Sequence, residues 1–202
     1  MGTRVYRKIG KGVRDMNILI LCEGRSSNTG IQIREAIRDL LERGGHSLQT
    51  IMLNREDLNP CVGCIGCWLK TPGQCIITDD DANSIASQQM NADALVLISE
   101  ITYGGFSADI KAFLDRSIQN IIPYFFDYKG EMHHPMRYKR FPIWIAVGYG
   151  NVSDAEKRTF TVLAERNALN MRPAKHLAVT VQDNEQLEKE AENILKTLEV
   201  SV

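Results

Sequence analysis

Short apolar runs alternate along the chain with segments in which apolar residues recur every three to four positions. Runs of this length are typical of strands that are buried on both faces of a parallel sheet. The pattern therefore predicts five buried strands, at residues 17–22, 48–53, 94–99, 141–148 and 176–181.

Amphipathic helical patterns fill the intervals between these strands. In the first interval, Ile33, Ile37 and Leu41 share one face of a helix. Ser153 and Glu156 have the spacing of a capping box, which predicts the start of a later helix. Because parallel strands need helical crossovers, the alternation predicts a three-layer, doubly wound α/β domain with a five-stranded parallel sheet. Further helical faces are expected at residues 82–89, 110–118, 160–168 and 187–198.

Length, charge and composition limit the class of protein. A chain of 202 residues is expected to form one domain, here residues 16–202, preceded by a basic N-terminal tail at residues 1–15. The formal net charge of −1 gives no indication of a nucleic-acid partner. We find neither a membrane-spanning apolar run nor a secretion signal, so we expect a cytoplasmic protein. In that compartment, clustered cysteines indicate a metal or redox site rather than a disulfide framework.

The loops after the first, third and fourth predicted strands are the expected binding site, because ligands of doubly wound folds bind at the carboxyl ends of the strands. The first loop brings hydroxyl and amide side chains to a helix start, where backbone N–H groups and the helix dipole favour an anion. A phosphate monoester fits this arrangement, although the same residues can simply cap the helix. The loop matches neither the Walker A pattern nor the dinucleotide-binding glycine pattern. Its residues are Arg25, Ser26, Ser27, Asn28 and Thr29.

Glycines and aromatic residues characterise the loops after the third and fourth strands. The glycines allow the backbone to approach a flat ligand closely, and Tyr103 or Phe106 could stack on it. The alternative is a pair of tight turns with packed aromatic residues. Together with the first loop, these loops favour a mononucleotide with a planar head. Their residues are Ile101, Thr102, Tyr103, Gly104, Gly105, Phe106, Gly148, Tyr149 and Gly150.

Four of the five cysteines lie in one short segment, at Cys61, Cys64, Cys67 and Cys75. Four thiolates with this spacing can bind a [4Fe-4S] cluster. Zinc, a dithiol redox pair and a metal-free cysteine-rich lid are the alternatives. Cys22, at the end of the first strand, is expected to be a thiol of the core.

Residues 121–140 are aromatic and basic and follow no regular pattern. We expect them to form a flap over the site or a subunit contact, and their basic residues could bind the phosphates of a nicotinamide cofactor. His133 and His134 could instead bind a metal ion, but adjacent side chains rarely face the same way.

The motifs of these loops resemble those of the flavodoxin-like NAD(P)H-dependent FMN reductase family, over about residues 16–200. The cysteine motif, which precedes an acidic helix start, is similar to that of the iron–sulfur flavoprotein branch. The resemblance is carried by Ser26-Ser27-Asn28-Thr29, by Ile101 to Ser107, and by Lys111-Ala112-Phe113-Leu114-Asp115-Arg116.

The resemblance implies a flavodoxin-like sheet with strand order 2-1-3-4-5. It also implies FMN, with its phosphate at residues 25–29 and its isoalloxazine ring against residues 101–106 and 148–150. Backbone N–H groups near Gly104, Gly105 and Tyr149 would stabilise charge on the reduced ring, so no catalytic side chain is assigned. Homodimers or homotetramers with the flavin near a subunit interface are implied as well.

The function that follows is an FMN-dependent oxidoreductase. It would take electrons from NAD(P)H and pass them to a small-molecule acceptor, such as a quinone, another flavin, a metal ion or oxygen. One alternative is an iron–sulfur flavoprotein that carries electrons from ferredoxin. A non-enzymatic flavin-binding interaction module is the other.

Overall fold

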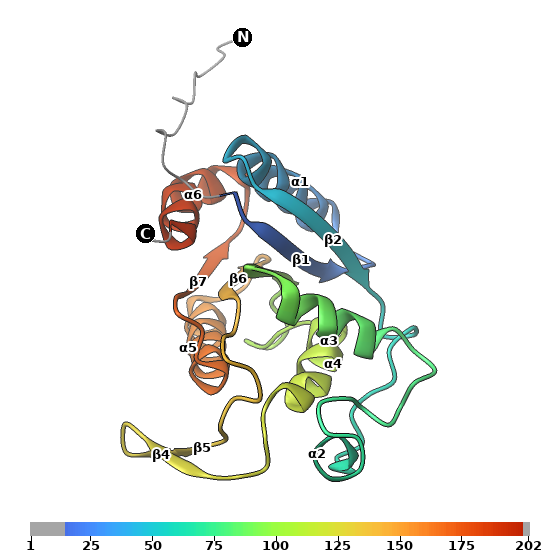
Figure 1. Ribbon diagram of the computed structural model, residues 1–202. Helices are drawn as coiled ribbons and strands as arrows, with labels where there is room; N and C mark the ends of the chain where they lie inside the picture. The colour runs from blue at the N-terminus through green and yellow to red at the C-terminus, as the bar shows by residue number, and fades with distance from the viewer. Residues whose placement is uncertain (1–14, 200–202) are drawn as a thin grey trace.

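The structure is a computed structural model that describes residues 15–199, so all but one residue of the predicted tail lies outside the described residues. Its centre is a five-stranded parallel sheet in the order β2-β1-β3-β6-β7 (Figure 1). The strands β4 and β5 lie outside this sheet, so β6 and β7 are its fourth and fifth strands. The order is therefore the expected 2-1-3-4-5, and the predicted fold is confirmed. The strands are β1 (Asn17–Glu23), β2 (Ser47–Leu53), β3 (Ala94–Glu100), β6 (Ile143–Tyr149) and β7 (His176–Val181).

Five helices cover the two faces of the sheet and complete three layers (Figure 1). Two helices share one hydrophobic core with the sheet, and three helices share the other. Within residues 15–199, we find no helix that is long and apolar enough to cross a membrane. The first pair is α1 (Asn28–Arg43) and α6 (Asn184–Leu198); the other three are α3 (Ala82–Asn91), α4 (Ala108–Arg116) and α5 (Asp154–Met171).

Strand β1 shows why the apolar runs become central strands. Ile18 and Ile20 point into the core beneath α1, whereas Leu19 and Leu21 point into the opposite core. Side chains alternate between the two faces of a strand, so a strand covered on both faces needs apolar residues at every position. Cys22 is 1% exposed, so its predicted position in the core is confirmed.

Side-chain caps define where the main helices begin. Ser107 is the N-cap of α4, and the predicted capping box of Ser153 and Glu156 is present at the start of α5. The start of α3 is capped from a neighbouring position. Asp81 occupies the N-cap position without a side-chain cap, and Asp80 instead accepts the N–H of Ala82 at 3.1 Å. Asp80 can do so because Arg116 holds its carboxylate in place through an ion pair of 2.8 Å.

Residues 121–140 contain a hairpin that the sequence pattern does not predict. Its strands are β4 (Phe126–Tyr128) and β5 (Glu131–His133), joined by a turn in which Lys129 and Gly130 both have positive φ. Such turns match the twist of a hairpin. The strands have only three residues each, too few for a periodic signal. Arg166 on α5 pairs with Glu131 at 2.7 Å and ties the hairpin to the domain.

Candidate functional site

The three predicted loops meet at one edge of the sheet, where hydrogen bonds join the ends of β1, β3 and β6. The N–H of Ile101 donates to the carbonyl of Tyr149 at 2.9 Å, which joins the β3 and β6 loops. The carboxylate of Glu23 joins all three ends. It accepts the N–H of Glu100 on one oxygen and, on the other, the hydroxyl of Tyr149 at 3.1 Å.

The first loop has the geometry of an anion site at the N-terminus of α1. Ser27 is the N-cap, and its hydroxyl accepts the N–H of Gly30 at 3.2 Å. Asn28 and Thr29 begin the helix, so their N–H groups belong to the first turn and have no acceptor within the helix. Ser26 donates its hydroxyl to the carbonyl of Glu23 at 2.8 Å, which fixes the turn that leads into the helix. A single phosphate would complete this arrangement of donors.

Arg25 belongs to this loop, but its side chain is directed to another partner. Its guanidinium binds both carboxylate oxygens of Glu56, at 2.8 and 3.0 Å, and both side chains are exposed. In this arrangement the donors of the phosphate loop come from backbone N–H groups and hydroxyls rather than from a cation.

The second loop is a two-residue turn that displays Tyr103. Thr102 and Gly105 exchange two backbone hydrogen bonds of 3.0 and 2.9 Å, and Tyr103 and Gly104 between them have positive φ. Tyr103 is 95% exposed, whereas Phe106 is buried against Trp144 and Phe160. The expected stacking by Phe106 is therefore corrected, because its ring completes the core, and the exposed ring of this loop belongs to Tyr103.

The third loop faces the interior more than was expected. A β-carbon built on Gly148 would lie 2.6 Å from the ring of Phe160, so this α-carbon packs on the core instead of facing a ligand. Tyr149 is also buried, and its hydroxyl lies against Gly30 of α1. Gly150 has a φ of 132° and is half-buried, and it carries the loop to the surface.

Glu23 is a candidate functional residue that the predicted loops did not include. Burial raises the pKa of its carboxyl, and hydrogen bonds from the Glu100 N–H, Ser107 and Tyr149 oppose that rise in part. Burial, together with the negative charge of Glu23, also raises the pKa of Tyr149, which remains a neutral phenol. The sequence feature that could have identified Glu23 is an acidic residue at the end of a mostly apolar strand.

The cysteine segment is fixed to the domain by Arg116, at the end of α4. This guanidinium donates to the carbonyl of Asn59 at 2.8 Å and to that of Ile77 at 3.1 Å, on either side of the four cysteines. It also pairs with Asp80 at 2.8 Å. Trp68 donates its indole N–H to the carbonyl of Ile118 at 3.0 Å. The segment therefore packs on α4 and on the short helix η1 (Ser117–Asn120), which follow the Tyr103 turn in the chain.

The other three thiols of the segment are neighbours of Cys67, which is part of the short helix α2 (Gly66–Leu69). Burial raises the pKa of Cys67, and the neighbouring Cys75, Cys61 and Cys64 raise it further. Cys67 and Cys75 are buried, Cys61 is half-buried and Cys64 is exposed. In residues 15–199, no three Cys, His, Asp or Glu side chains are gathered closely enough to bind a metal ion. The donor set suits an iron–sulfur cluster in kind and number, but the thiols would have to converge.

Two buried donors on residues that bond to the cysteine segment lack hydrogen-bond partners. Asn83 and Gln119 both accept the N–H of Cys75, at 2.9 and 3.0 Å. The Nε2 of Gln119 and the Nε of Arg116 are buried without a hydrogen-bond partner. Buried N–H groups without partners are costly and favour negative charge nearby, which thiolates would supply.

The two adjacent histidines do not form a metal site with each other. His133 contacts Asn170 on α5 at 3.0 Å through Nδ1. His134 packs between the rings of Trp68 and Phe125, with centroids 4.9 and 4.6 Å away. His134 thus links the hairpin region to the cysteine segment.

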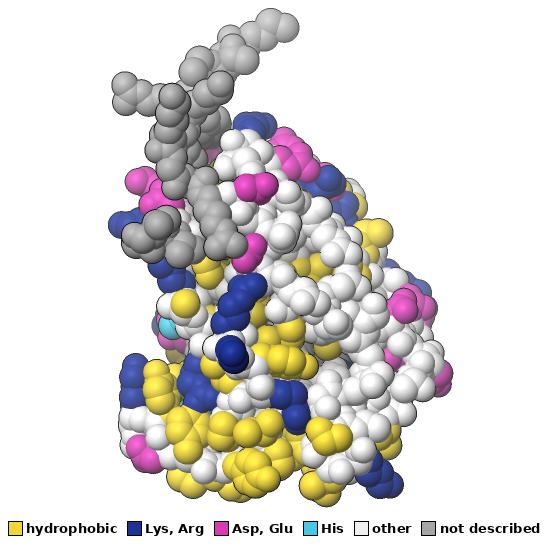
Figure 2. All heavy atoms as spheres, in the orientation of Figure 1, with side chains coloured by type: hydrophobic (Ala, Val, Ile, Leu, Met, Phe, Trp, Pro, Cys, Tyr) yellow, Lys and Arg dark blue, Asp and Glu magenta, His cyan; other side chains and the backbone are white. Residues whose placement is uncertain are grey.

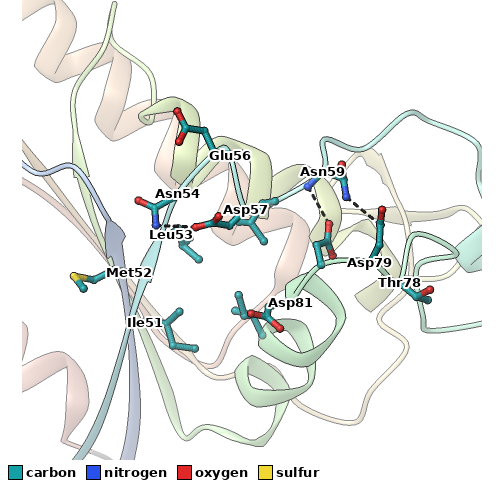
Figure 3. Close-up of a pocket in the computed structure, with 13 residues that line it drawn as sticks. Ile51, Met52, Leu53, Asn54, Glu56, Asp57, Asn59, Thr78, Asp79 and Asp81 are labelled. Carbon is teal, nitrogen blue, oxygen red and sulfur yellow. Dashed lines mark hydrogen bonds between the residues drawn. The ribbon is translucent and has the colours of Figure 1, made fainter.

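A separate cavity of about 620 Å³ lies beside the end of β2 and the start of α3 (Figure 3). Asn54 donates to Asp57 at 2.9 Å on one side of it. The described residues that line the cavity include no Lys or Arg, so it would repel a phosphate. Its exposed carboxylates are those of Glu56, Asp57, Asp79 and Asp81.

Residues 16–183 match the family of NADPH-dependent FMN reductases. The chain belongs to this family. The expected family is confirmed, and the membership supports the expected class of enzyme, an oxidoreductase. The match extends from the start of β1 to the residue before α6, so it includes all three loops and the cysteine segment.

Two iron–sulfur flavoproteins are similar to parts of this FMN reductase family member. That of Methanocaldococcus jannaschii is 39% identical over 90 residues, which are 45% of each chain. That of Archaeoglobus fulgidus is 28% identical over 99 residues, which are 49% of this chain and 44% of the relative. The chain thus spans less than half the length of the curated relatives that it matches.

Solved structures share the fold across almost the whole chain. An NAD(P)H:quinone oxidoreductase from Methanothermobacter marburgensis has a TM-score of 0.62 at 15% identity, with 92% of this chain and 98% of that chain covered. An FMN-dependent NADH-azoreductase from Bacillus anthracis, in complex with FMN, has a TM-score of 0.60 at 12% identity and covers 90% and 97%. At such low identity these structures support the fold alone.

Proposed function

We propose that this protein is an FMN-dependent oxidoreductase that takes electrons from NAD(P)H and passes them to a small-molecule acceptor. The observation that carries the proposal is the position of two features at one edge of the sheet. The anion-binding start of α1 and the exposed ring of Tyr103 both follow strands that lie side by side, β1 and β3. A flavin mononucleotide has one phosphate and one planar ring to match them.

The phosphate of FMN would be held by the loop that caps α1. Ser27, Asn28 and Thr29 offer backbone N–H groups and short polar side chains there. The helix dipole adds a favourable potential for the anion. The cavity beside β2 is lined by several carboxylates and, among the described residues that line it, by no Lys or Arg, so it is a less favourable place for the phosphate.

The ring of FMN would lie against the turn from Thr102 to Gly105, with Tyr103 stacked on it or covering it. When bound, FMN supplies the redox chemistry, accepting two electrons from a nicotinamide and giving them to an acceptor. The chain orients the ring and limits water at the site. Backbone N–H groups at Gly104 and Tyr149 are the proposed donors to its polar edge.

Reconstitution with FMN tests this proposal. The purified chain is mixed with FMN, and the bound flavin is measured from its two absorption bands after gel filtration. NADPH and NADH are then added in the absence of oxygen. Bleaching of the bound flavin by either nucleotide would support the proposal, whereas a chain that takes up no FMN would refute it.

The second candidate is an iron–sulfur flavoprotein that receives electrons from ferredoxin. Its support is the set of four thiols near Cys67, together with the iron–sulfur relatives that match part of the chain. Cys61, Cys64, Cys67 and Cys75 would bind a [4Fe-4S] cluster. Anaerobic purification followed by iron and sulfide analysis tests it. A flavin that reduced ferredoxin bleaches and NADPH does not would favour this candidate.

We also propose that copies of the chain assemble into a homodimer or homotetramer. Apolar side chains gather along one part of the surface, over the hairpin and the cysteine segment (Figure 2). They include Tyr124, Phe125 and Met132 near or on the hairpin, and Val62 and Leu69 in the cysteine segment. Light scattering measures the mass in solution, and a monomer at all concentrations would contradict the proposal.

A further inference from the structure

Glu23 is an acidic residue buried at the point where the phosphate loop begins, and it is 4% exposed. Its carboxylate accepts hydrogen bonds from the Glu100 N–H and from the hydroxyl of Tyr149. Both donors are neutral. They therefore satisfy the oxygens of Glu23 without compensating the negative charge that its ionised form carries.

A single phenol oxygen separates this carboxylate from the start of α1. The hydroxyl of Tyr149 is 3.1 Å from Oε2 of Glu23. A β-carbon built on Gly30, in the first turn of α1, would lie only 2.3 Å from the same hydroxyl. Ser26, in the loop itself, donates its hydroxyl to the backbone carbonyl of Glu23 at 2.8 Å. Glu23 thus lies directly behind the donors proposed to hold the flavin phosphate.

We propose that Glu23 is a specificity-determining residue of this site, which takes up one proton when a phosphate group binds at the start of α1. The inference rests on the proposed FMN site. A phosphate in this loop and an ionised Glu23 would be like charges with little water between them, which is unfavourable. Transfer of one proton from solvent to the carboxylate removes the repulsion and leaves a neutral acid that keeps its hydrogen bonds.

The other ionisable groups around Glu23 do not supply a compensating charge. Tyr149 on β6 is a neutral phenol, because its pKa is raised. The side chain of Glu100 on β3 is exposed and would add negative charge. On the side of α1, Arg34 is paired with Glu35 at 3.0 Å. Cys22, next to Glu23 on β1, is a buried thiol whose pKa is raised by burial.

The expected consequence is a pH-dependent affinity for phosphorylated flavin. Binding that takes up one proton weakens by up to about tenfold for each unit of pH, once the carboxyl of the free protein is ionised. Riboflavin has no phosphate, so its affinity should not show this dependence. The site would therefore distinguish FMN from riboflavin best at low pH.

Calorimetry measures the proton uptake directly. FMN is titrated into the flavin-free full chain at about pH 7.5, in two buffers with different ionisation enthalpies, and the number of protons taken up follows from the difference in heat. The same titrations are made with E23Q and with riboflavin. E165Q, which removes an exposed carboxylate on α5, is the matched control.

We expect uptake of up to one proton by the wild-type protein and by E165Q with FMN. Uptake should be lost in E23Q, whose affinity for FMN should exceed that of the wild type increasingly as pH rises. Equal proton counts for the wild type and E23Q, or equal uptake with riboflavin, would overturn the inference while leaving the FMN site standing. Failure of the wild type to bind FMN would overturn both. If E23Q does not fold, the wild type alone tests the inference. Equal numbers of protons taken up with FMN and with riboflavin would then overturn it.

Discussion

Arg116 and Asp80 form an ion pair of 2.8 Å whose side chains are 1% and 2% exposed. The guanidinium also donates to carbonyls on either side of the cysteine segment, at Asn59 and Ile77. Arg116 belongs to the helix that follows the Tyr103 turn. One buried side chain therefore holds the candidate thiol site against the element that positions the candidate flavin site.

Removal of this guanidinium is expected to be strongly destabilising. R116L leaves the carboxylate of Asp80 buried without its partner, and breaking a buried pair in this way costs roughly 3–5 kcal/mol. Urea unfolding measures the loss. The control is K111A, which breaks the exposed pair with Asp115 on the same helix and should cost less than about 1 kcal/mol. Equal losses in the two variants would contradict the role of Arg116.

Glu23 is expected to make stability depend on pH in an unusual direction. Burial raises the pKa of its carboxyl above the ordinary 4.5. A group with a raised pKa stabilises the fold below its ordinary pKa, and that contribution is lost as pH rises through the folded value. The free energy of unfolding of the wild type should therefore fall relative to that of E23Q as pH rises above this ordinary value. Thermal unfolding of both proteins over a series of pH values measures the difference, and parallel curves would refute it.

Tyr103 is expected to contribute to flavin affinity and not to stability. Y103A removes a ring that is 95% exposed, so the melting temperature should not change. Loss of stacking on the flavin should weaken FMN binding by about 1 kcal/mol, or roughly fivefold. Quenching of flavin fluorescence measures the affinity. Y124A, which removes an exposed tyrosine before the hairpin, should bind FMN as the wild type does.

The cysteine segment is expected to be dispensable for binding FMN. C64A combined with C67A removes two of the four thiols, while the proposed phosphate and ring contacts come from other loops. Bound FMN per chain should remain close to that of the wild type. Absorption after gel filtration measures it, and loss of FMN in the double variant would mean that the segment closes the pocket.

The sequence predicted the sheet because the periodicity of its strands is a local signal. The run from His176 to Val181 was predicted with the bounds that the structure has. The capping box of Ser153 and Glu156 followed from side-chain chemistry within a few residues. Such features need only neighbours along the chain, so a single sequence is enough to find them.

The features that were missed depend on contacts between distant residues. Phe106 looked like a ligand contact until its packing against Trp144 and Phe160 was known. The partner of Glu23 is Tyr149, 126 positions away. Burial of Arg116 depends on Asp80, which lies on another segment. Local pattern can show that a residue is polar or aromatic, but only the fold determines what it faces.

Arg116 joins the two ends of the cysteine segment, while Trp68 and Cys75 in its interior bond to η1 and α3. The bonds at Asn59 and Ile77 hold the two ends together regardless of the residues between them. Insertions, deletions or loss of a thiol within the loop should leave the domain folded. The same scaffold could therefore gain or lose a second redox centre during evolution by changing one closed loop.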